Sequence, residues 1–403
     1  MTLKTVDLGE NELDDAAIER LAVALKTHTR LHMLFLDNNR ISRKGAEFLA
    51  ECLKNKQDLR VLNIDRNNIG SEGAKAIAEQ LKNNYGLSKL YCDSNDIGEA
   101  GCEAMSSCLE MMDSLKKICL ENNDIKDKGA VALSKALENN DTLLSLHIEN
   151  NDITRQGAYT LGEMLSNKFK LSKLNLNNNP IGDDGLLRVC EGIAKIETLR
   201  IITIAGCGIT KTSINNLSQA LKNKRFLTKL LLDNNNIGPE GARQLAKGLR
   251  ENETLTNLHL ANCNVGEEGT FAIAEVLSNK KNLLVLDMTN NKTMVNGCIA
   301  ICKAIMHHTT LRELYLSNNY IGPDGAKYVA KVLDNTKYIT EVWLSSNGIF
   351  QEGASALGKA LKDKRYLEVL SLKRNDIGMS GLKDLEAVLQ LSKTIRELDL
   401  AGN

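Results

Sequence analysis

The feature that most constrains the fold is a phrase that recurs fifteen times at an unbroken interval of 28 residues. The phrase is a leucine, two free positions, an apolar residue, one free position, an apolar residue, two free positions and an asparagine. It begins at Leu3, Leu31, Leu59, Leu87, Leu115, Leu143, Leu171, Leu199, Leu227, Leu255, Leu283, Leu311, Ile339, Leu367 and Ile395. A period in this range indicates a solenoid whose units pack against their sequence neighbours.

The first part of each unit predicts a short strand that ends in a turn. In the third unit, Leu62 and Ile64 follow Leu59 and alternate as one face of a strand does. Asn67 then turns the chain, and its side chain can bond backbone groups that the turn leaves unpaired. Thirteen of the fifteen phrases carry asparagine at this position, and the other two carry cysteine.

The second part of each unit predicts one helix. Gly70 and Gly73 enclose the turn into this helix, and Glu72 near its start complements the helix dipole. The apolar residues that follow are spaced i, i+3, i+4 and i+7, which places them on one helix face: Ala74, Ile77, Ala78 and Leu81.

These units predict an α/β leucine-rich repeat solenoid. Parallel strands lie about 4.8 Å apart, whereas helices are about 10 Å wide. A stack of such units must bend into a horseshoe, with strands on its concave face and helices on its convex face. We expect a single array over residues 1–403, with 14 full repeats and a partial fifteenth from Ile395.

Composition restricts the classes of partner and the compartment. Lys plus Arg equals Asp plus Glu at 51 each, so no net charge attracts nucleic acid or an anionic membrane. The N-terminus lacks the pattern of a signal peptide, and no apolar run approaches the ~18 residues that span a bilayer. The ten cysteines mostly occupy core positions, and such buried thiols fit a reducing, cytoplasmic compartment.

The whole repeat resembles the ribonuclease-inhibitor-like class of leucine-rich repeats. Clear instances are LTKLLLDNNNIGPEGARQLAKGLRENET, from Leu227, and LRELYLSNNYIGPDGAKYVAKVLDNTKY, from Leu311. The regular 28-residue period is most similar to the arrays of NOD-like receptors. This resemblance implies a non-enzymatic protein-protein interaction module that binds a protein partner on its concave face.

The free strand positions indicate where such a partner would bind. At the fifth position of the phrase, Tyr315 and Trp343 occur in adjacent repeats, and Trp343 is the only tryptophan of the chain. Trp and Tyr dominate interface hot spots. We expect this pair, with Glu313, Glu341 and Arg312 beside it, to form one anchor for the partner.

A second anchor is predicted in the N-terminal half. Phe35, Tyr91 and His147 occupy the same fifth position. The seventh position carries a carboxylate in five consecutive repeats, and we call these residues the acidic strip: Asp37, Asp65, Asp93, Glu121 and Glu149. Carboxylates spaced roughly 5 Å apart suit a basic partner. A solvated polar face without a partner is the alternative interpretation.

Other functions are compatible with parts of this pattern. The chain could regulate another enzyme, as a GTPase-activating or inhibitor-type protein, or be the ligand-sensing fragment of an innate immune receptor. Cys119 and His147 share the fifth position in adjacent repeats and could form a nucleophile and base. An open sheet offers them no oxyanion site. No catalytic residue, metal site or cofactor is therefore predicted; His147 and His259, roughly 20 Å apart, cannot share a metal.

Overall fold

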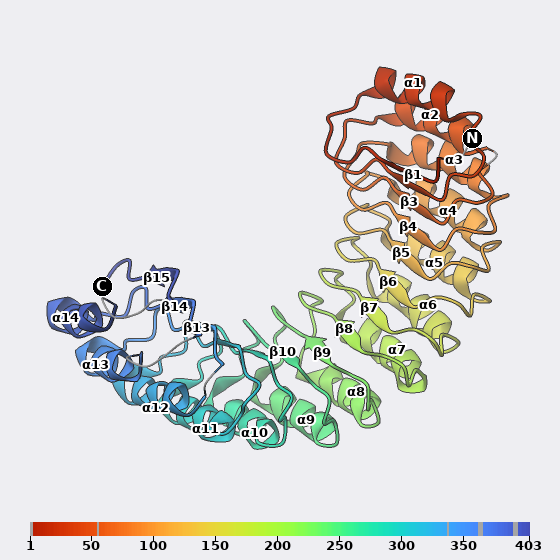
Figure 1. The fold of residues 1–403 in the computed structure, drawn as a ribbon. Coiled ribbons are helices and arrows are strands. Elements are labelled where there is room, and N and C mark those ends of the chain that lie inside the picture. The colour runs from red at the N-terminus through yellow and green to blue at the C-terminus, as the bar shows by residue number, and fades with distance from the viewer. Residues whose placement is uncertain (1–2, 55, 337, 362–365, 390–393) are drawn as a thin grey trace. The chain divides into compact units, whose positions relative to one another are not determined.

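The computed structural model describes residues 3–54, 56–336, 338–361, 366–389 and 394–403, in which 15 strands alternate with 14 helices (Figure 1). The strands are β1 Thr5–Asp7, β2 Met33–Phe35, β3 Val61–Asn63, β4 Lys89–Tyr91, β5 Lys117–Cys119, β6 Ser145–His147, β7 Lys173–Asn175, β8 Ile201–Thr203, β9 Lys229–Leu231, β10 Asn257–His259, β11 Val285–Asp287, β12 Glu313–Tyr315, β13 Glu341–Trp343, β14 Val369–Ser371 and β15 Glu397–Asp399.

The helices are α1 Asp15–Leu25, α2 Arg43–Leu53, α3 Gly70–Leu81, α4 Gly98–Leu109, α5 Lys126–Leu137, α6 Arg155–Leu165, α7 Gly182–Lys195, α8 Lys211–Leu221, α9 Gly238–Leu249, α10 Gly266–Leu277, α11 Met294–Ile305, α12 Gly322–Asn335, α13 Phe350–Leu361 and α14 Gly378–Leu389. Within the described ranges, none of them has both the length and the apolar character required to cross a bilayer.

The chain divides into two compact units, one ending at Cys207 and one beginning at Gly208. The first unit contains β1–β8 and the second β9–β15, and within each unit the strands are parallel and follow sequence order. Equivalent residues of neighbouring repeats are paired, as Leu314 is with Val342. Each repeat position therefore forms a column across the strands, and the predicted leucine-rich repeat solenoid is confirmed.

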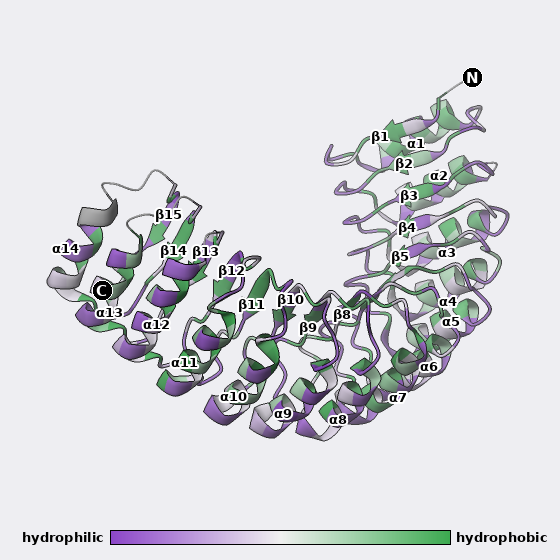
Figure 2. Cartoon of the chain, turned by 60° about the horizontal axis from the view of Figure 1, so that its bottom comes forward, coloured by the Kyte–Doolittle hydropathy of each residue, from purple (hydrophilic) through white to green (hydrophobic). Residues whose placement is uncertain are grey.

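The core of each unit lies between its strands and its helices. In the third repeat Leu62 is buried, and all four predicted apolar residues of α3 are buried with it. Figure 2 shows both hydrophobic and hydrophilic segments along the helices, as expected when one side packs on the core and the other faces water. The sheet surface turned away from the helices is called the strand face below.

The asparagine of each phrase joins one repeat to the next. The Asn123 side-chain amide donates to the carbonyl oxygens of Cys92, at 2.8 Å, and Glu121, at 3.0 Å. Its Oδ1 accepts the backbone N–H of Asn95 at 3.0 Å. The predicted role of this asparagine is confirmed, and it is stronger than expected because the bonds cross between repeats. The repeated arrangement is called the asparagine ladder.

Two cysteines keep part of the asparagine ladder. The Cys207 thiol donates to the carbonyl oxygens of Leu176, at 3.3 Å, and Ala205, at 3.4 Å. The Cys263 thiol reaches the carbonyl oxygen of Leu232 at 3.2 Å. Because a thiol is both a weak donor and a weak acceptor, cysteine replaces the hydrogen bonds of asparagine only in part.

The residue before the ladder asparagine occupies a free position of the phrase, but its backbone conformation is constrained. Asn122, Asn178 and Asn318 have φ values of 55°, 54° and 56°, in the left-handed region. Asparagine adopts this conformation more readily than most residues. The frequent Asn-Asn pairs of this chain therefore combine one residue that turns the backbone with one that bonds it.

Buried lysines close the ends of helices, a feature that the sequence analysis did not anticipate. The Lys56 ammonium group donates to the carbonyl oxygen of Leu25, the last residue of α1, at 2.8 Å. Lys280 does the same for Leu249 at the end of α9, at 2.7 Å, and Lys168 bonds carbonyl groups that follow α5. A cation at a helix C-terminus satisfies free carbonyl groups and complements the dipole. Burial lowers the pKa of Lys168 and Lys280.

We expect Asn123→Ala to lower the free energy of unfolding by about 2 kcal/mol or more, because buried backbone groups lose their partners. Asn123→Cys should cost less, since Cys207 shows that a thiol at this position reaches the same carbonyl groups. Urea unfolding followed by circular dichroism measures both. Ser107→Ala, on the exposed side of α4, is the control. An unchanged transition for Asn123→Ala would contradict the ladder's importance.

Candidate functional site

The predicted aromatic neighbours lie side by side on the strand face of the second unit. Tyr315 on β12 is paired in register with Trp343 on β13. Their ring centroids are 6.0 Å apart, and the ring planes differ by 22°, so the rings are stacked. Both residues are partly exposed. The predicted adjacency is confirmed, and the two residues are called the aromatic pair.

Two glutamates hold the aromatic pair in place. The Tyr315 hydroxyl lies 2.9 Å from Glu313 Oε2 and 3.1 Å from Glu341 Oε2 and can donate to either. The Trp343 indole N–H donates to Glu341 Oε2 at 3.1 Å. Burial, together with the Glu313 and Glu341 carboxylates, raises the pKa of Tyr315. The phenol therefore stays neutral, and the pair is an apolar surface, held by hydrogen bonds, with an acidic margin.

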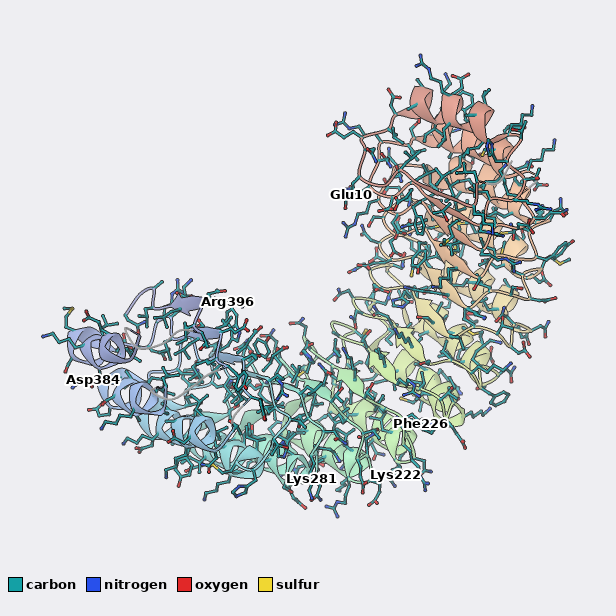
Figure 3. The ribbon with its side chains drawn as sticks, viewed as in Figure 1. Glu10, Lys222, Phe226, Lys281, Asp384 and Arg396 are labelled. Atoms are coloured by element: carbon teal, nitrogen blue, oxygen red, sulfur yellow. The ribbon has the colours of Figure 1, made fainter. Side chains whose placement is uncertain are left out.

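Arg312 contacts groups other than the aromatic pair. Its guanidinium donates to the Thr310 carbonyl oxygen at 2.8 Å and lies over the Tyr338 ring, 5.0 Å from the centroid. The Tyr338 ring is in turn 5.3 Å from that of Tyr366. These aromatic residues lie where helices lead into strands, as does Phe226, which is labelled in Figure 3. The structure therefore places Arg312 beside the loops that lead from helices into strands, which are called the loop edge.

The rings of the predicted second anchor are not brought together. Phe35, Tyr91 and His147 lie on β2, β4 and β6, so Asn63 and Cys119 intervene in the same column. Residues two strands apart are separated by about 10 Å. The three side chains are partly exposed, and they form separate points along the strand face rather than one cluster.

Cys119 and His147 do not form an activated nucleophile and base. Cys119 was expected at an open strand position, but its side chain is buried. Burial, with the Asp93 carboxylate nearby, raises the pKa of the Cys119 thiol to about 12. The thiolate is the nucleophilic form, and it is not populated at neutral pH. His147 Nε2 lies 2.8 Å from the Ser145 hydroxyl instead.

The acidic strip follows the ends of β2–β6 and borders a small cavity of the first unit. The cavity has a volume of about 170 Å³, and Glu10, labelled in Figure 3, lies at its margin. Its lining also includes four members of the strip, Asp37, Asp65, Asp93 and Glu121. The fifth member, Glu149, is buried and accepts a hydrogen bond from the Asn175 amide.

Part of the acidic strip also has a structural function that the sequence analysis missed. Asp65 Oδ1 accepts the backbone N–H of Asp93 at 2.6 Å, and Asp93 Oδ1 accepts that of Glu121 at 2.7 Å. Asn177, at the same repeat position, accepts the N–H of Ala205 at 2.7 Å. An acceptor at this position therefore links adjacent repeats, whether or not it carries a charge.

The charge of the acidic strip near neutral pH is lower than five carboxylates suggest. Burial raises the pKa of Asp65 to about 6, with a contribution from Asp37. Burial and the Asp65 carboxylate raise the pKa of Asp93 to about 7. The pKa of Glu121 is raised by burial and by Glu149. Closely spaced, partly buried carboxylates resist simultaneous ionisation.

Three further side chains converge on the strand face of the second unit. Asp233, His259 and Asp287 each offer a ligand atom, and these atoms lie within 4.8 Å of one another. His259 Nδ1 is 4.0 Å from Asp287 Oδ2. Within the described ranges, no other group of three or more His, Cys, Asp or Glu side chains has this geometry. In the sequence, Asp233 is at the seventh position of its phrase, and His259 and Asp287 are at the fifth position of the next two phrases. This spacing could have indicated the cluster, but a comparison of histidine positions alone does not detect it.

Comparison with known families agrees with this architecture. The leucine-rich repeat family matches nine segments that together make up just over half of the chain, at residues 1–22, 55–78, 114–134, 139–162, 167–190, 223–246, 251–274, 307–330 and 363–385. The chain belongs to the leucine-rich repeat family. A comparison with curated proteins found no match.

One solved structure shares the fold at low sequence identity, and two others match with lower TM-scores. A leucine-rich repeat protein from Leptospira interrogans has a TM-score of 0.59 and 17% identity, over 99% of this chain and 96% of that chain. An internalin from Listeria monocytogenes has a TM-score of 0.47 and 16% identity, over 100% and 88%. A chain from the Rad7–Elc1 complex of yeast has a TM-score of 0.48 and 16% identity, over 97% of this chain and 84% of that chain.

We expect Asp93→Asn to stabilise the first unit at pH 8. The amide keeps an acceptor for the Glu121 N–H, as Asn177 does for Ala205, and removes a charge that burial opposes. Because the pKa of Asp93 is raised to about 7 on folding, the contribution of Asp93 to wild-type stability falls as the pH rises from about 4 toward 7.

The gain should be about 1 kcal/mol at pH 8 after allowance for solvent screening. It should disappear near pH 5, where wild-type Asp93 is protonated. Thermal unfolding at both pH values measures the difference, with Asp96→Asn, an exposed neighbour, as the control. A variant less stable than wild type at pH 8 would refute this assignment.

Proposed function

We propose that this chain is a non-enzymatic protein-protein interaction module that binds its partner on the strand face. The aromatic pair of the second unit is the observation that carries this proposal. Tyr315 and Trp343 are stacked and partly exposed in a family whose fold is typical of interaction modules. Tyr and Trp contribute most binding energy in many interfaces.

The geometry of the aromatic pair favours binding at low entropic cost. Hydrogen bonds to Glu313 and Glu341 fix both rings before a partner arrives. Side chains that are already ordered lose little freedom on association. The two carboxylates at the margin suit a partner that presents basic or hydrogen-bond-donating groups around an apolar residue.

The cavity beside the acidic strip supports a partner with basic side chains. Its volume of about 170 Å³ suits the end of a lysine or arginine side chain, and its five carboxylates outnumber the one cation in the lining, Arg66. A bound cation would favour the ionised forms of Asp65 and Asp93. Phe35, Tyr91 and His147 remain candidate contacts along the same strand face, whereas Glu149, at the strip's end, is buried.

Further features of the chain support one class of leucine-rich repeat and one cellular compartment. Helices of 11 to 14 residues in each repeat support the ribonuclease-inhibitor-like class, and the regular period supports a likeness to NOD-like-receptor arrays. That period also supports one array of 14 full repeats and a partial fifteenth from Ile395. The ten cysteines are free and buried, which supports a reducing, cytoplasmic location. Equal numbers of acidic and basic residues favour a protein partner over nucleic acid or membrane.

We expect Trp343→Ala to weaken partner binding at least tenfold without unfolding the chain, because Trp343 is partly exposed rather than part of the core. Affinity capture from lysate, followed by binding measurements with the captured protein, compares the variant with wild type. Tyr338→Ala, at the exposed loop edge, is the matched control and should bind normally. Equal binding by Trp343→Ala and wild type would reject the aromatic pair as an anchor.

A further inference from the structure

We propose that Asp233, His259 and Asp287 bind one divalent transition-metal ion, with Zn²⁺ as the best match. The three ligand atoms lie within 4.8 Å of one another on the strand face of the second unit. This inference does not depend on the proposed protein partner, because all three ligands come from the chain itself.

The repeat register brings the three residues together. His259 on β10 is paired with Asp287 on β11. It is also paired with Leu231 on β9, and Asp233 follows two residues beyond Leu231. Strands β10 and β11 thus supply His259 and Asp287, at the roughly 4.8 Å spacing of neighbouring strands, and the segment that follows β9 supplies Asp233. The strand backbone fixes the starting points of His259 and Asp287, and the end of β9 sets that of Asp233.

Backbone hydrogen bonds orient both carboxylates. Asp233 Oδ1 accepts the N–H of Ala261 at 2.7 Å. Asp287 Oδ1 accepts the N–H of Thr289 at 2.9 Å. Each carboxylate therefore has one oxygen fixed by the backbone, which also sets the direction of the second. Such outer contacts preorganise ligands around a metal ion.

The pair of His259 and Asp287 needs only a small movement to reach a metal-binding separation, and the three ligand atoms together start no more than 4.8 Å apart. Ligands bound at about 2.0–2.2 Å in tetrahedral geometry are about 3.3–3.6 Å apart. His259 Nδ1 and Asp287 Oδ2 are 4.0 Å apart. Rotation of the partly exposed His259 ring can close this difference without a change in the backbone.

The donor set selects the class of ion. One imidazole nitrogen and two carboxylate oxygens suit Zn²⁺ and similar transition metals, whereas Ca²⁺ and Mg²⁺ prefer oxygen ligands alone. The side chains of His259 and Asp287 are 24% and 19% exposed, so water can enter but the site is partly shielded. Three protein ligands leave a fourth position for water.

His147 in the first unit provides a natural comparison. It occupies the same column position as His259 and lies 3.7 Å from a carboxylate oxygen of Glu149. However, its Nε2 is 2.8 Å from the Ser145 hydroxyl, and that Glu149 oxygen accepts from Asn175. Protein groups already occupy the His147 cluster, whereas the His259 ring makes no hydrogen bond to a residue in the described ranges.

Titration of the full chain with ZnCl₂ tests this site. The protein is first treated with a chelator and kept reduced, and isothermal titration calorimetry then gives stoichiometry and affinity at pH 7.5. Wild type and His147→Gln should each bind one equivalent at this site. His259→Gln and Asp287→Asn should bind at least tenfold more weakly. Co²⁺ should give a visible absorption band that His259→Gln lacks.

A loss of Zn²⁺ binding through a missing ligand can be distinguished from a loss through unfolding. The fifth position tolerates Asn175 and Ser371 elsewhere in the chain, so we expect His259→Gln to fold, which circular dichroism verifies. Unchanged Zn²⁺ affinity in a folded His259→Gln variant would overturn the proposal, as would absence of binding to wild type. Equal or tighter binding of Ca²⁺ that is insensitive to His259→Gln would overturn it as well.

Discussion

The asparagine ladder is the interaction on which the structure depends. The Asn123 side chain bonds carbonyl groups on both sides of a repeat boundary and accepts the N–H of Asn95 from the preceding repeat. The strand register follows from this connection, because a shift of one residue would separate the asparagine side chains from the buried backbone groups that they bond. The columns on the strand face, and every candidate site, result from that register.

The fold could be predicted in detail from apolar spacing. Alternation at Leu62 and Ile64 and the helical spacing after Ala74 locate strand, helix and core, because burial of apolar groups dominates each repeat. The buried lysines could not be predicted. Lys56 and Lys280 are charged residues at positions that other repeats fill with Asn84 or Met112, and only the three-dimensional path of the preceding helix shows why a cation fits there.

The candidate site was predictable where register alone decides it. The adjacency of Tyr315 and Trp343 follows from a single repeat interval. The direction of a long side chain does not follow from the repeat interval. Arg312 was expected beside the aromatic pair, but its guanidinium lies over Tyr338. The carboxylate of Asp93 illustrates another limit: its backbone partner and its burial, rather than its residue type, determine its charge near neutral pH.

The buried lysines have a consequence for following the protein in solution. Lys56, Lys168 and Lys280 are almost completely covered, and their ammonium groups are held by helix-end carbonyls. An amine-modifying reagent reaches such groups only after local opening. These three lysines are spaced four repeats apart. The order in which they are chemically labelled therefore reveals which segment of the chain opens first.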